Sequence, residues 1–210
     1  MRSRSVLSIV LVAAATQPLS AQRRVQVTPF LASYYSAREL GNYVAPPDSA
    51  GLTYHVLQNS SPAIGVSAAL MLSDVLGVEA SGAYAFSAGR IQGCDQTAPV
   101  VCSYLDLSGS LTMLSLAGRY RPRRSNFEMV AGLNMDMRGG DLWSGRESNT
   151  SLGVLLGAGV IAQVTPKLPL NVRGELHAYS FDPDENDPDW NSAMALDFLF
   201  KLGIPLGGRR

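Results

Sequence analysis

The chain has 210 residues, of which 46% are hydrophobic and 16% are charged, with 17 basic and 17 acidic side chains. This length suits one domain of ordinary size, and the hydrophobic fraction excludes general disorder. The balanced charge lacks the basic excess that nucleic-acid-binding proteins carry, so we expect no nucleic-acid partner.

The amino terminus has the pattern of a secretory signal peptide. Two arginines precede an apolar run over residues 6–15, and a Leu-Ser-Ala cleavage pattern follows. We therefore predict a signal over residues 1–21 and a mature domain over residues 22–210. A retained membrane helix is the alternative, but the run is much shorter than the ~20 residues that span a bilayer. Removing the signal takes two arginines and no acid, which leaves 15 basic and 17 acidic residues.

The mature chain shows the two-residue periodicity of β-strands along most of its length. In residues 63–72, for example, Ile64, Val66 and Leu70 share one face, and Gly65 and Ser67 lie on the other. Eight such strands are predicted, over residues 25–35, 63–72, 76–86, 104–120, 126–137, 151–164, 168–180 and 192–206.

One of these segments breaks its own pattern. Within residues 104–120 the apolar phase switches between Met113 and Leu114. A β-bulge is the simplest interpretation, and a misplaced strand boundary is the other.

The links between the predicted strands alternate in length. Three short links of three to five residues (SDV, RPRRS and TPKLP) alternate with long ones around residues 36–61, 87–103, 138–150 and 181–191. No apolar run after Gln22 approaches the length of a membrane helix, so any membrane crossing must use strands of a closed barrel. Together these features predict an all-β fold, an eight-stranded antiparallel up-and-down transmembrane β-barrel. Its short turns and both termini would be periplasmic, and its long loops extracellular.

The polar faces of these strands indicate what fills the barrel. The apolar row of each strand would meet lipid, and the other row would face an interior only wide enough for side chains to fill. Inward charges must then pair with one another or with trapped water, and inward Gly153, Gly157 and Gly159 leave space for them. The predicted lumen network consists of Glu79, Glu128, Asp136, Arg173, Glu175, His177, Asp197 and Lys201.

A secreted soluble barrel of the lipocalin kind, or a sandwich, is the alternative fold. It would reverse the two faces and place the apolar row inside. The small number of charges and the alternation of short and long links favour the membrane form.

The two cysteines agree with export. Cys94 and Cys102 lie in GCDQTAPVVCS, a segment with Gly, Pro and polar residues, and seven residues lie between them. In an oxidising compartment this spacing favours a disulfide that staples the loop. Two free thiols are the alternative, and a metal site is disfavoured because only Asp95 is near enough to add a ligand.

The chain resembles small outer-membrane β-barrel proteins of the type of outer-membrane proteins A and X. The resemblance covers residues 25–206 and rests on a diffuse pattern: VTPFLASYY, then LGVEASGAYAF, then the Gly-rich strand at 151–164. Many members end on an aromatic residue that the assembly machinery reads, whereas here Leu206 is followed by Gly-Gly-Arg-Arg.

No set of residues predicts an enzyme. Some outer-membrane barrels are lipid A deacylases with a His, Ser and Glu triad, and His177, Ser180 and Glu185 give a superficial match. Nucleophile and base must lie within hydrogen-bond reach, but Ser180 is three residues from His177 and points to the opposite strand face. A buried, hydrogen-bonded lumen histidine is the simpler interpretation.

The acidic stretch DPDENDPDW at residues 182–190 offers hard oxygen ligands for calcium or magnesium, but it lacks the Gly and Glu of an EF-hand loop. A solvated loop is the simpler interpretation, so no metal site is assigned.

For function, we expect a non-enzymatic, monomeric barrel without a cofactor, exported to the outer membrane, with outer-membrane lipid and lipopolysaccharide as its surroundings. Its role would be envelope integrity or surface contact with a ligand that the sequence leaves open. A narrow porin-like channel or small-solute binder is the second hypothesis, and an envelope enzyme the third.

Overall fold

The structure is a computed structural model that describes residues 25–37, 40–44, 52–95, 101–143, 149–165, 168–181 and 190–207. The predicted signal peptide and residues 182–189 of the acidic stretch lie outside the described residues, so both remain predictions. Within the described part of the chain, no helix is long and apolar enough to cross a membrane.

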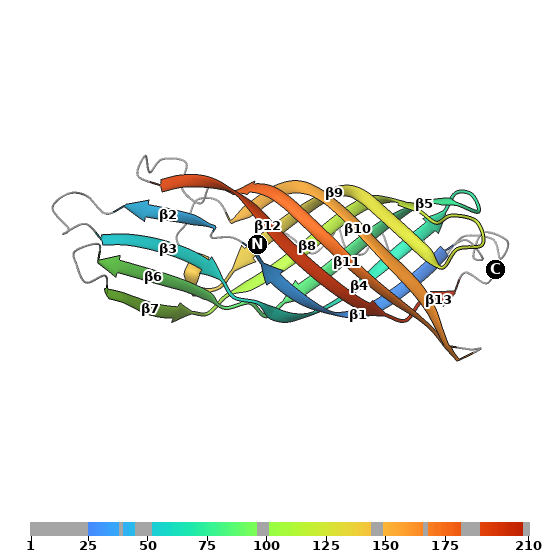
Figure 1. The fold of residues 1–210 in the computed structure, drawn as a ribbon, viewed down its shortest axis with the longest axis horizontal. Helices are drawn as coiled ribbons and strands as arrows, with labels where there is room; N and C mark the ends of the chain where they lie inside the picture. Colours follow the sequence, from blue (N-terminus) through green and yellow to red (C-terminus); the bar gives the residue numbers. More distant parts are fainter. Residues whose placement is uncertain are drawn as a thin grey trace, which may run out of the picture.

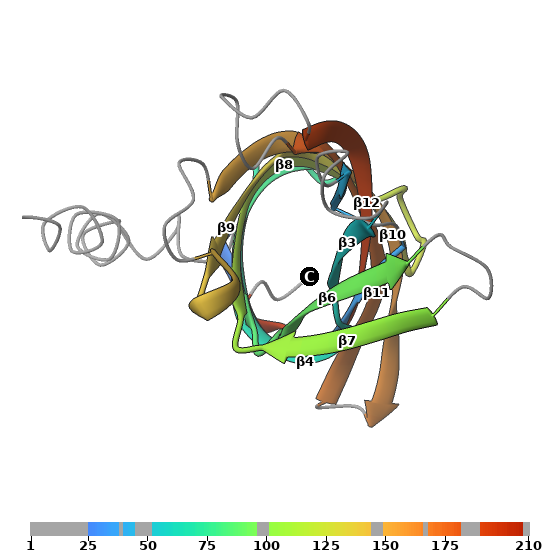
Figure 2. The ribbon, with the colours of Figure 1, turned by 90° about the vertical axis from the view of Figure 1, so that its left-hand side faces the viewer.

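Eight antiparallel strands close into a barrel (Figure 1). In order around the barrel they are β1 (Val25–Ser36), β4 (Ser61–Met71), β5 (Leu76–Ala85), β8 (Ser110–Tyr120), β9 (Phe127–Gly139), β10 (Thr150–Thr165), β11 (Leu168–Phe181) and β12 (Trp190–Gly203). Pairing of β1 with β12, from Phe30 opposite Gly203 to Ser36 opposite Asp197, closes the ring, which Figure 2 shows along its axis. The predicted eight-stranded up-and-down barrel is thus confirmed.

The outward row of the wall is apolar around the whole barrel. In β4, Ile64, Val66 and Leu70 are about half exposed, whereas their neighbours Ser67 and Ala69 are almost fully buried. The same alternation runs through the other barrel strands, as in β10 and β12. Soluble monomers rarely expose continuous apolar surface beyond a few hundred Å². The outer face is therefore a lipid-facing surface, and the inverted soluble alternative is excluded.

Short turns lie at one end of the barrel. Residues 72–75 join β4 to β5, and the Leu72 amide donates to the Leu76 carbonyl over 2.9 Å. Residues 121–126 join β8 to β9 through a turn that the Ser125 amide closes on the Pro122 carbonyl, at 3.2 Å. β1 begins at this end, beside the short strand β13 (Leu206–Gly207), which pairs with it. This is the predicted periplasmic end.

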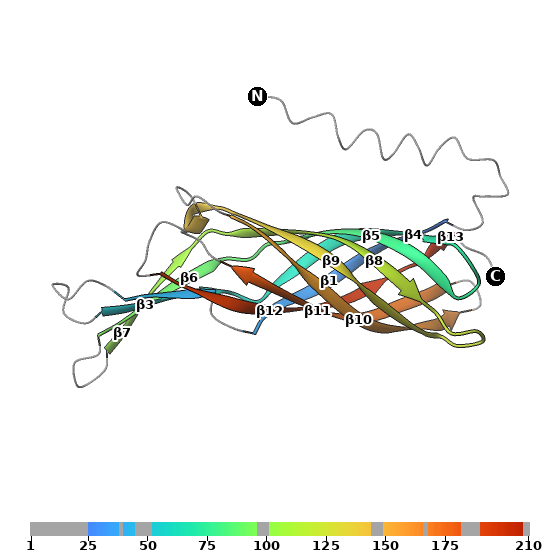
Figure 3. The ribbon, with the colours of Figure 1, turned by 90° about the horizontal axis from the view of Figure 1, so that it is seen from above.

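The first two long links are largely strands rather than loops. β2 (Gly41–Val44), β3 (Leu52–Gln58), β6 (Gly89–Asp95) and β7 (Val101–Leu107) form a four-stranded antiparallel sheet. It joins the wall where β2 pairs with the start of β12, and it stands beyond the barrel at the end opposite the short turns (Figure 3). There β3 leads into β4, β5 into β6 and β7 into β8 after breaks of two or three residues.

The predicted bulge near Met113 is wrong, because β8 alternates regularly from Ser110 to Tyr120 and its pairings show no register shift. The chain instead breaks at residues 108–109, between β7 and β8, so the misplaced boundary is the correct interpretation. Leu111 and Met113 face inward because the lumen beside them is apolar. A bulge does occur in β10, between Gln163 and Thr165.

Candidate functional site in the barrel interior

A cluster of buried charges fills the periplasmic half of the interior. Arg173 on β11 forms an ion pair with Glu79 on β5, and its Nε lies 3.0 Å from Oε1 of Glu175. Lys201 on β12 reaches the same Glu175, with 2.8 Å between Nζ and Oε2. Arg119 on β8 lies 3.4 Å from Glu79. Cations and carboxylates thus alternate across the lumen from four strands.

Glu128 on β9 completes this cluster. Its carboxylate accepts hydrogen bonds from Arg119 over 2.5 Å, from Arg121 over 3.2 Å and from the Asn171 amide over 2.6 Å. Arg173 approaches the same carboxylate at 3.5 Å. Removing one partner of a buried ion pair leaves an uncompensated charge, so this arrangement fixes the positions of the strands that supply it.

A second polar cluster lies nearer the extracellular end. Arg138 donates to the Tyr179 hydroxyl over 2.6 Å, and that hydroxyl donates to Asp197 over 2.5 Å. Nε2 of His177 lies 3.3 Å from Glu175, and its Nδ1 lies 3.9 Å from Asp136. His177 therefore connects the two clusters.

All eight residues of the predicted lumen network face the interior, and none is more than 4% exposed. The structure brings them together through partners that the sequence reasoning missed, Arg119, Arg138 and Tyr179. The apolar phase of residues 104–120 was assigned wrongly, so Arg119 was not recognised as inward-facing, although it shares a strand face with Ala117. Arg138 lies one residue beyond the predicted end of its strand.

Glycines of β10 give the long side chains their space. Gly157 pairs with Glu175 and Gly159 with Arg173 across the β10–β11 ladder. A Cβ on Gly157 would lie 2.9 Å from Cγ of Glu175, and one on Gly159 would lie 2.8 Å from Cβ of Arg173. Any larger residue would push these charges out of place.

Little free volume remains among the buried charges. A cavity of about 10 Å³ lies between Ser67, Glu79, Arg119, Asn171, Arg173 and Lys201. That is at the lower limit of the space that one water molecule needs. The charged side chains therefore leave little room between them at this level.

Apolar side chains fill the extracellular mouth. Leu40, Val56, Trp143, Tyr179 and Ala195 form one buried cluster, with Ile91 and Leu107 packed against it. Trp143 belongs to a short 3₁₀ turn, η3 (Asp141–Trp143), which follows β9. Among the described residues, charged side chains thus occupy the periplasmic half of the interior and an apolar cluster lies toward the extracellular end.

The structure does not bring together the residues of the superficial deacylase match, and the described residues contain no cluster that could hold a metal. Ser180 is on the outer face of β11, so it cannot act with His177, and Glu185 lies outside the described residues. No group of three or more His, Cys, Asp or Glu side chains has the geometry of a metal site in this part of the chain.

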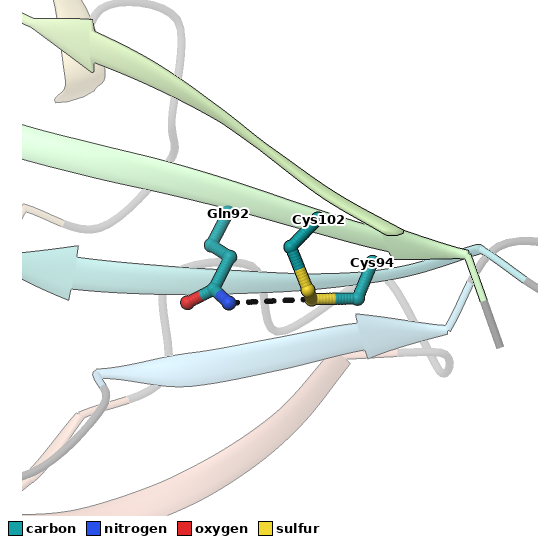
Figure 4. The surroundings of a disulfide bond; sticks show 3 residues. All are labelled: Gln92, Cys94 and Cys102. Carbon is teal, nitrogen blue, oxygen red and sulfur yellow. Dashed lines mark hydrogen bonds between the residues drawn. A yellow bond between two sulfur atoms is a disulfide. The ribbon is translucent and has the colours of Figure 1, made fainter. Parts of the chain in front are cut away.

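A disulfide staples the projecting sheet. Cys94 of β6 and Cys102 of β7 are paired opposite each other and bonded, with 4.1 Å between their Cα atoms (Figure 4). The Gln92 amide donates to Sγ of Cys94 over 3.3 Å (Figure 4). The strand order ends at β7, so among the described residues this strand has a neighbour on one side only.

The same hairpin carries an exposed ion pair. Nε of Arg90 on β6 donates to Asp106 on β7 over 2.6 Å, and this hydrogen bond lowers the pKa of the Asp106 carboxyl. The Arg90 guanidinium also lies 5.4 Å from the centre of the Tyr104 ring. Tyr104 and Leu105 are both more than half exposed, so the edge strand presents apolar surface to water.

A closed wall with an apolar outside and a charged, filled inside is the arrangement of a transmembrane barrel, and such barrels occupy outer membranes. The protein is a small outer-membrane β-barrel. No protein-family model matches the chain, and no curated protein matches it significantly.

Solved outer-membrane barrels resemble this fold at low identity. Neisserial surface protein A is 15% identical, with a TM-score of 0.46, over 87% of this chain and 96% of that one. The outer membrane protein AlkL is 13% identical, with a TM-score of 0.49, over 98% and 95%. Ail, the attachment invasion locus protein of Yersinia pestis, is 11% identical, with a TM-score of 0.40, over 87% and 97%. At these scores the assignment rests on the strand pairing and the two faces of the wall.

Proposed function

We propose that the protein is a non-enzymatic, non-conducting anchor that holds a disulfide-stapled sheet at the cell surface. The observation that carries this proposal is the filled interior. Buried ion pairs block the periplasmic half, and an apolar cluster fills the extracellular mouth. A barrel closed in this way contributes to the envelope through its wall and through what stands above the membrane.

The projecting sheet is the part that supports a role in surface contact. Its outer strand β7 has backbone groups without a strand partner among the described residues, next to the exposed Tyr104 and Leu105. Open sheet edges pair readily with extended segments of other chains. The barrel itself acts as a monomer surrounded by lipid and lipopolysaccharide.

Single-channel recording in planar bilayers tests the closed lumen. Purified wild-type barrel should give no stepwise conductance under conditions where a general porin does. A double variant, Glu79→Ala with Arg173→Ala, removes the ion pair between these two residues, together with the contacts of Arg173 to Glu128 and Glu175 and of Glu79 to Arg119, and serves as the comparison. Reproducible conductance steps from the wild type would favour the narrow channel instead.

Activity is tested separately by incubating the barrel with lipid A and measuring acyl-chain release. We expect none, in the wild type and in His177→Ala alike. Release by the wild type that His177→Ala abolishes would establish the envelope-enzyme alternative.

A further inference from the structure

An apolar groove of about 750 Å³ crosses the lipid-facing side of the barrel. Its outward lining spans six neighbouring strands and belongs to two adjacent rows of paired residues. One row is Leu76, Tyr120, Met129, Ala158, Gly174 and Phe200, and the other includes Gly118, Ala131, Leu156, Leu176 and Phe198. The lining also includes residues of the inward face, Arg119, Val130, Glu175 and Leu199 among them.

The groove exists because small residues form its floor. Gly118, Ala131, Ala158 and Gly174 lie along it, and a Cβ on Gly174 would meet no atom within 4 Å. Large outward side chains stand on either side, Tyr120 and Met129 in one row and Leu156 and Leu176 in the other. Its volume is in the range of roughly 300–1,000 Å³ that small-molecule sites occupy.

The groove has a direction relative to the membrane. Leu76 begins β5 and Tyr120 ends β8, so one end of the groove lies beside the short periplasmic turns. Gly174 lies six residues inside β11, so the groove there is nearer the middle of the wall, and Phe200 lies three residues before the end of β12 at Gly203. An acyl chain entering from the periplasmic leaflet takes this course, from the interface toward the bilayer centre.

Two arginines stand at the periplasmic end. Arg123 and Arg124 are exposed in the turn that begins directly after Tyr120, and neither forms an ion pair with a described residue. Arg121, by contrast, is engaged with Glu128. The backbone bond from the Arg121 amide to the Val75 carbonyl, 2.8 Å, holds this turn against the 72–75 turn.

The local charge at these two turns is positive. Asp74 is the acidic residue of the 72–75 turn, whereas the 121–126 turn carries Arg121, Arg123 and Arg124, so the two turns together hold more cations than carboxylates. Guanidinium groups bind phosphate through paired hydrogen bonds, and cations near an interface attract anionic headgroups.

From the groove and the basic turn together, we propose that the barrel binds an anionic glycerophospholipid of the periplasmic leaflet. Arg123 and Arg124 hold its phosphate, and one acyl chain lies in the groove. Lipopolysaccharide also carries phosphates and acyl chains, but it lies in the leaflet opposite the basic turn. The positive charge of the turn and the direction of the groove therefore favour a lipid of the periplasmic leaflet.

Native mass spectrometry of the folded barrel in detergent micelles tests this proposal, with phosphatidylglycerol, phosphatidylcholine and lipid A as probes. The wild type should retain phosphatidylglycerol in preference to the other two. Arg123→Gln with Arg124→Gln should lower that retention about tenfold or more, the loss expected from charge-assisted hydrogen bonds. Arg90→Gln, which removes a cation from the extracellular sheet, should leave it unchanged.

A second pair of variants tests the groove itself. Ala158→Phe fills the floor and should reduce phosphatidylglycerol retention, whereas Ala80→Phe places the same side chain on the outer face of β5, away from the groove. A shift in gel mobility between boiled and unboiled samples shows that each variant is folded. Equal retention of phosphatidylglycerol and phosphatidylcholine by the wild type, preferential retention of lipid A, or no response to Ala158→Phe or to the arginine substitutions would each overturn the proposal.

Discussion

At the scale of single residues, the interior depends on glycine standing opposite long charged side chains. Gly159 faces Arg173, which in turn contacts three carboxylates. Gly174, directly across from Ala158, faces lipid with open space around it. A glycine on the inner face of this strand pair therefore makes room for a buried charge, whereas a glycine on the outer face leaves open space toward lipid.

Gly159→Ala should destabilise the barrel by about 1–3 kcal/mol, the usual cost of overpacking. The added Cβ would lie 2.6 Å from the Val172 carbonyl oxygen, a backbone atom that cannot move aside. Gly174→Ala is the matched control and should be neutral or stabilising by about 0.5–1 kcal/mol, because alanine restricts the unfolded chain more than glycine does. Urea unfolding in lipid vesicles measures both changes. Equal effects of the two substitutions would contradict the assignment of the faces.

The Arg90–Asp106 pair predicts a pH effect outside the membrane. The hydrogen bond from Arg90 lowers the pKa of Asp106 in the folded sheet below its ordinary value of about 3.9. The pair therefore stabilises the sheet above that ordinary value, and the contribution is lost as pH falls through the lowered pKa.

In Arg90→Gln the Asp106 pKa should return toward the ordinary value. A carbon-detected NMR titration of the Asp106 carboxyl in micelles measures it. An unchanged pKa would mean that the pair does not persist in solution.

At the scale of elements, period-two alternation is sufficient to predict the eight barrel strands, because each strand has lipid on one face. It fails in residues 104–120, where Leu111 and Met113 face an apolar part of the lumen. Alternation in the sequence appears only where one face of a strand is polar and the other is apolar. It disappears when both faces are apolar. The sequence did not identify two charged partners. Arg119 was missed because the phase of its strand was assigned wrongly, and Arg138 because it lies one residue beyond the predicted end of its strand.

The disulfide should act on the β6–β7 hairpin alone. Cys94 and Cys102 are eight positions apart, and closing so short a loop restricts its open states by about 2–3 kcal/mol. In the double variant Cys94→Ser with Cys102→Ser, amide hydrogen exchange in β6 and β7 should accelerate on the order of 100-fold. Amides of β9 and β10 provide the internal control and should keep their wild-type rates. Acceleration throughout the barrel would show that the sheet and the wall unfold as one unit.

At the scale of the whole molecule, apolar side chains face outward and charged side chains face inward, the reverse of a soluble protein. This inversion could be predicted from the sequence. The projecting sheet could not, because it depends on pairing between two links that are far apart in the chain, β3 with β6. Local composition in those links, rich in Gly, Pro, Asn and Asp, indicates loops. Pairing across the two hairpins overrides that local tendency by extending strands that the barrel already holds side by side.

The inversion makes a depth-dependent prediction. Leu156 is 60% exposed on the outer face near the middle of β10, and Val164 is 58% exposed on the same strand near its periplasmic end. An arginine facing lipid costs about 2–4 kcal/mol at the bilayer midplane and about 0–1 kcal/mol near the interface. Leu156→Arg should therefore lower the free energy of unfolding in vesicles much more than Val164→Arg does. If this outer face met water instead of lipid, both substitutions would be nearly neutral, so equal small effects would contradict the membrane-spanning arrangement.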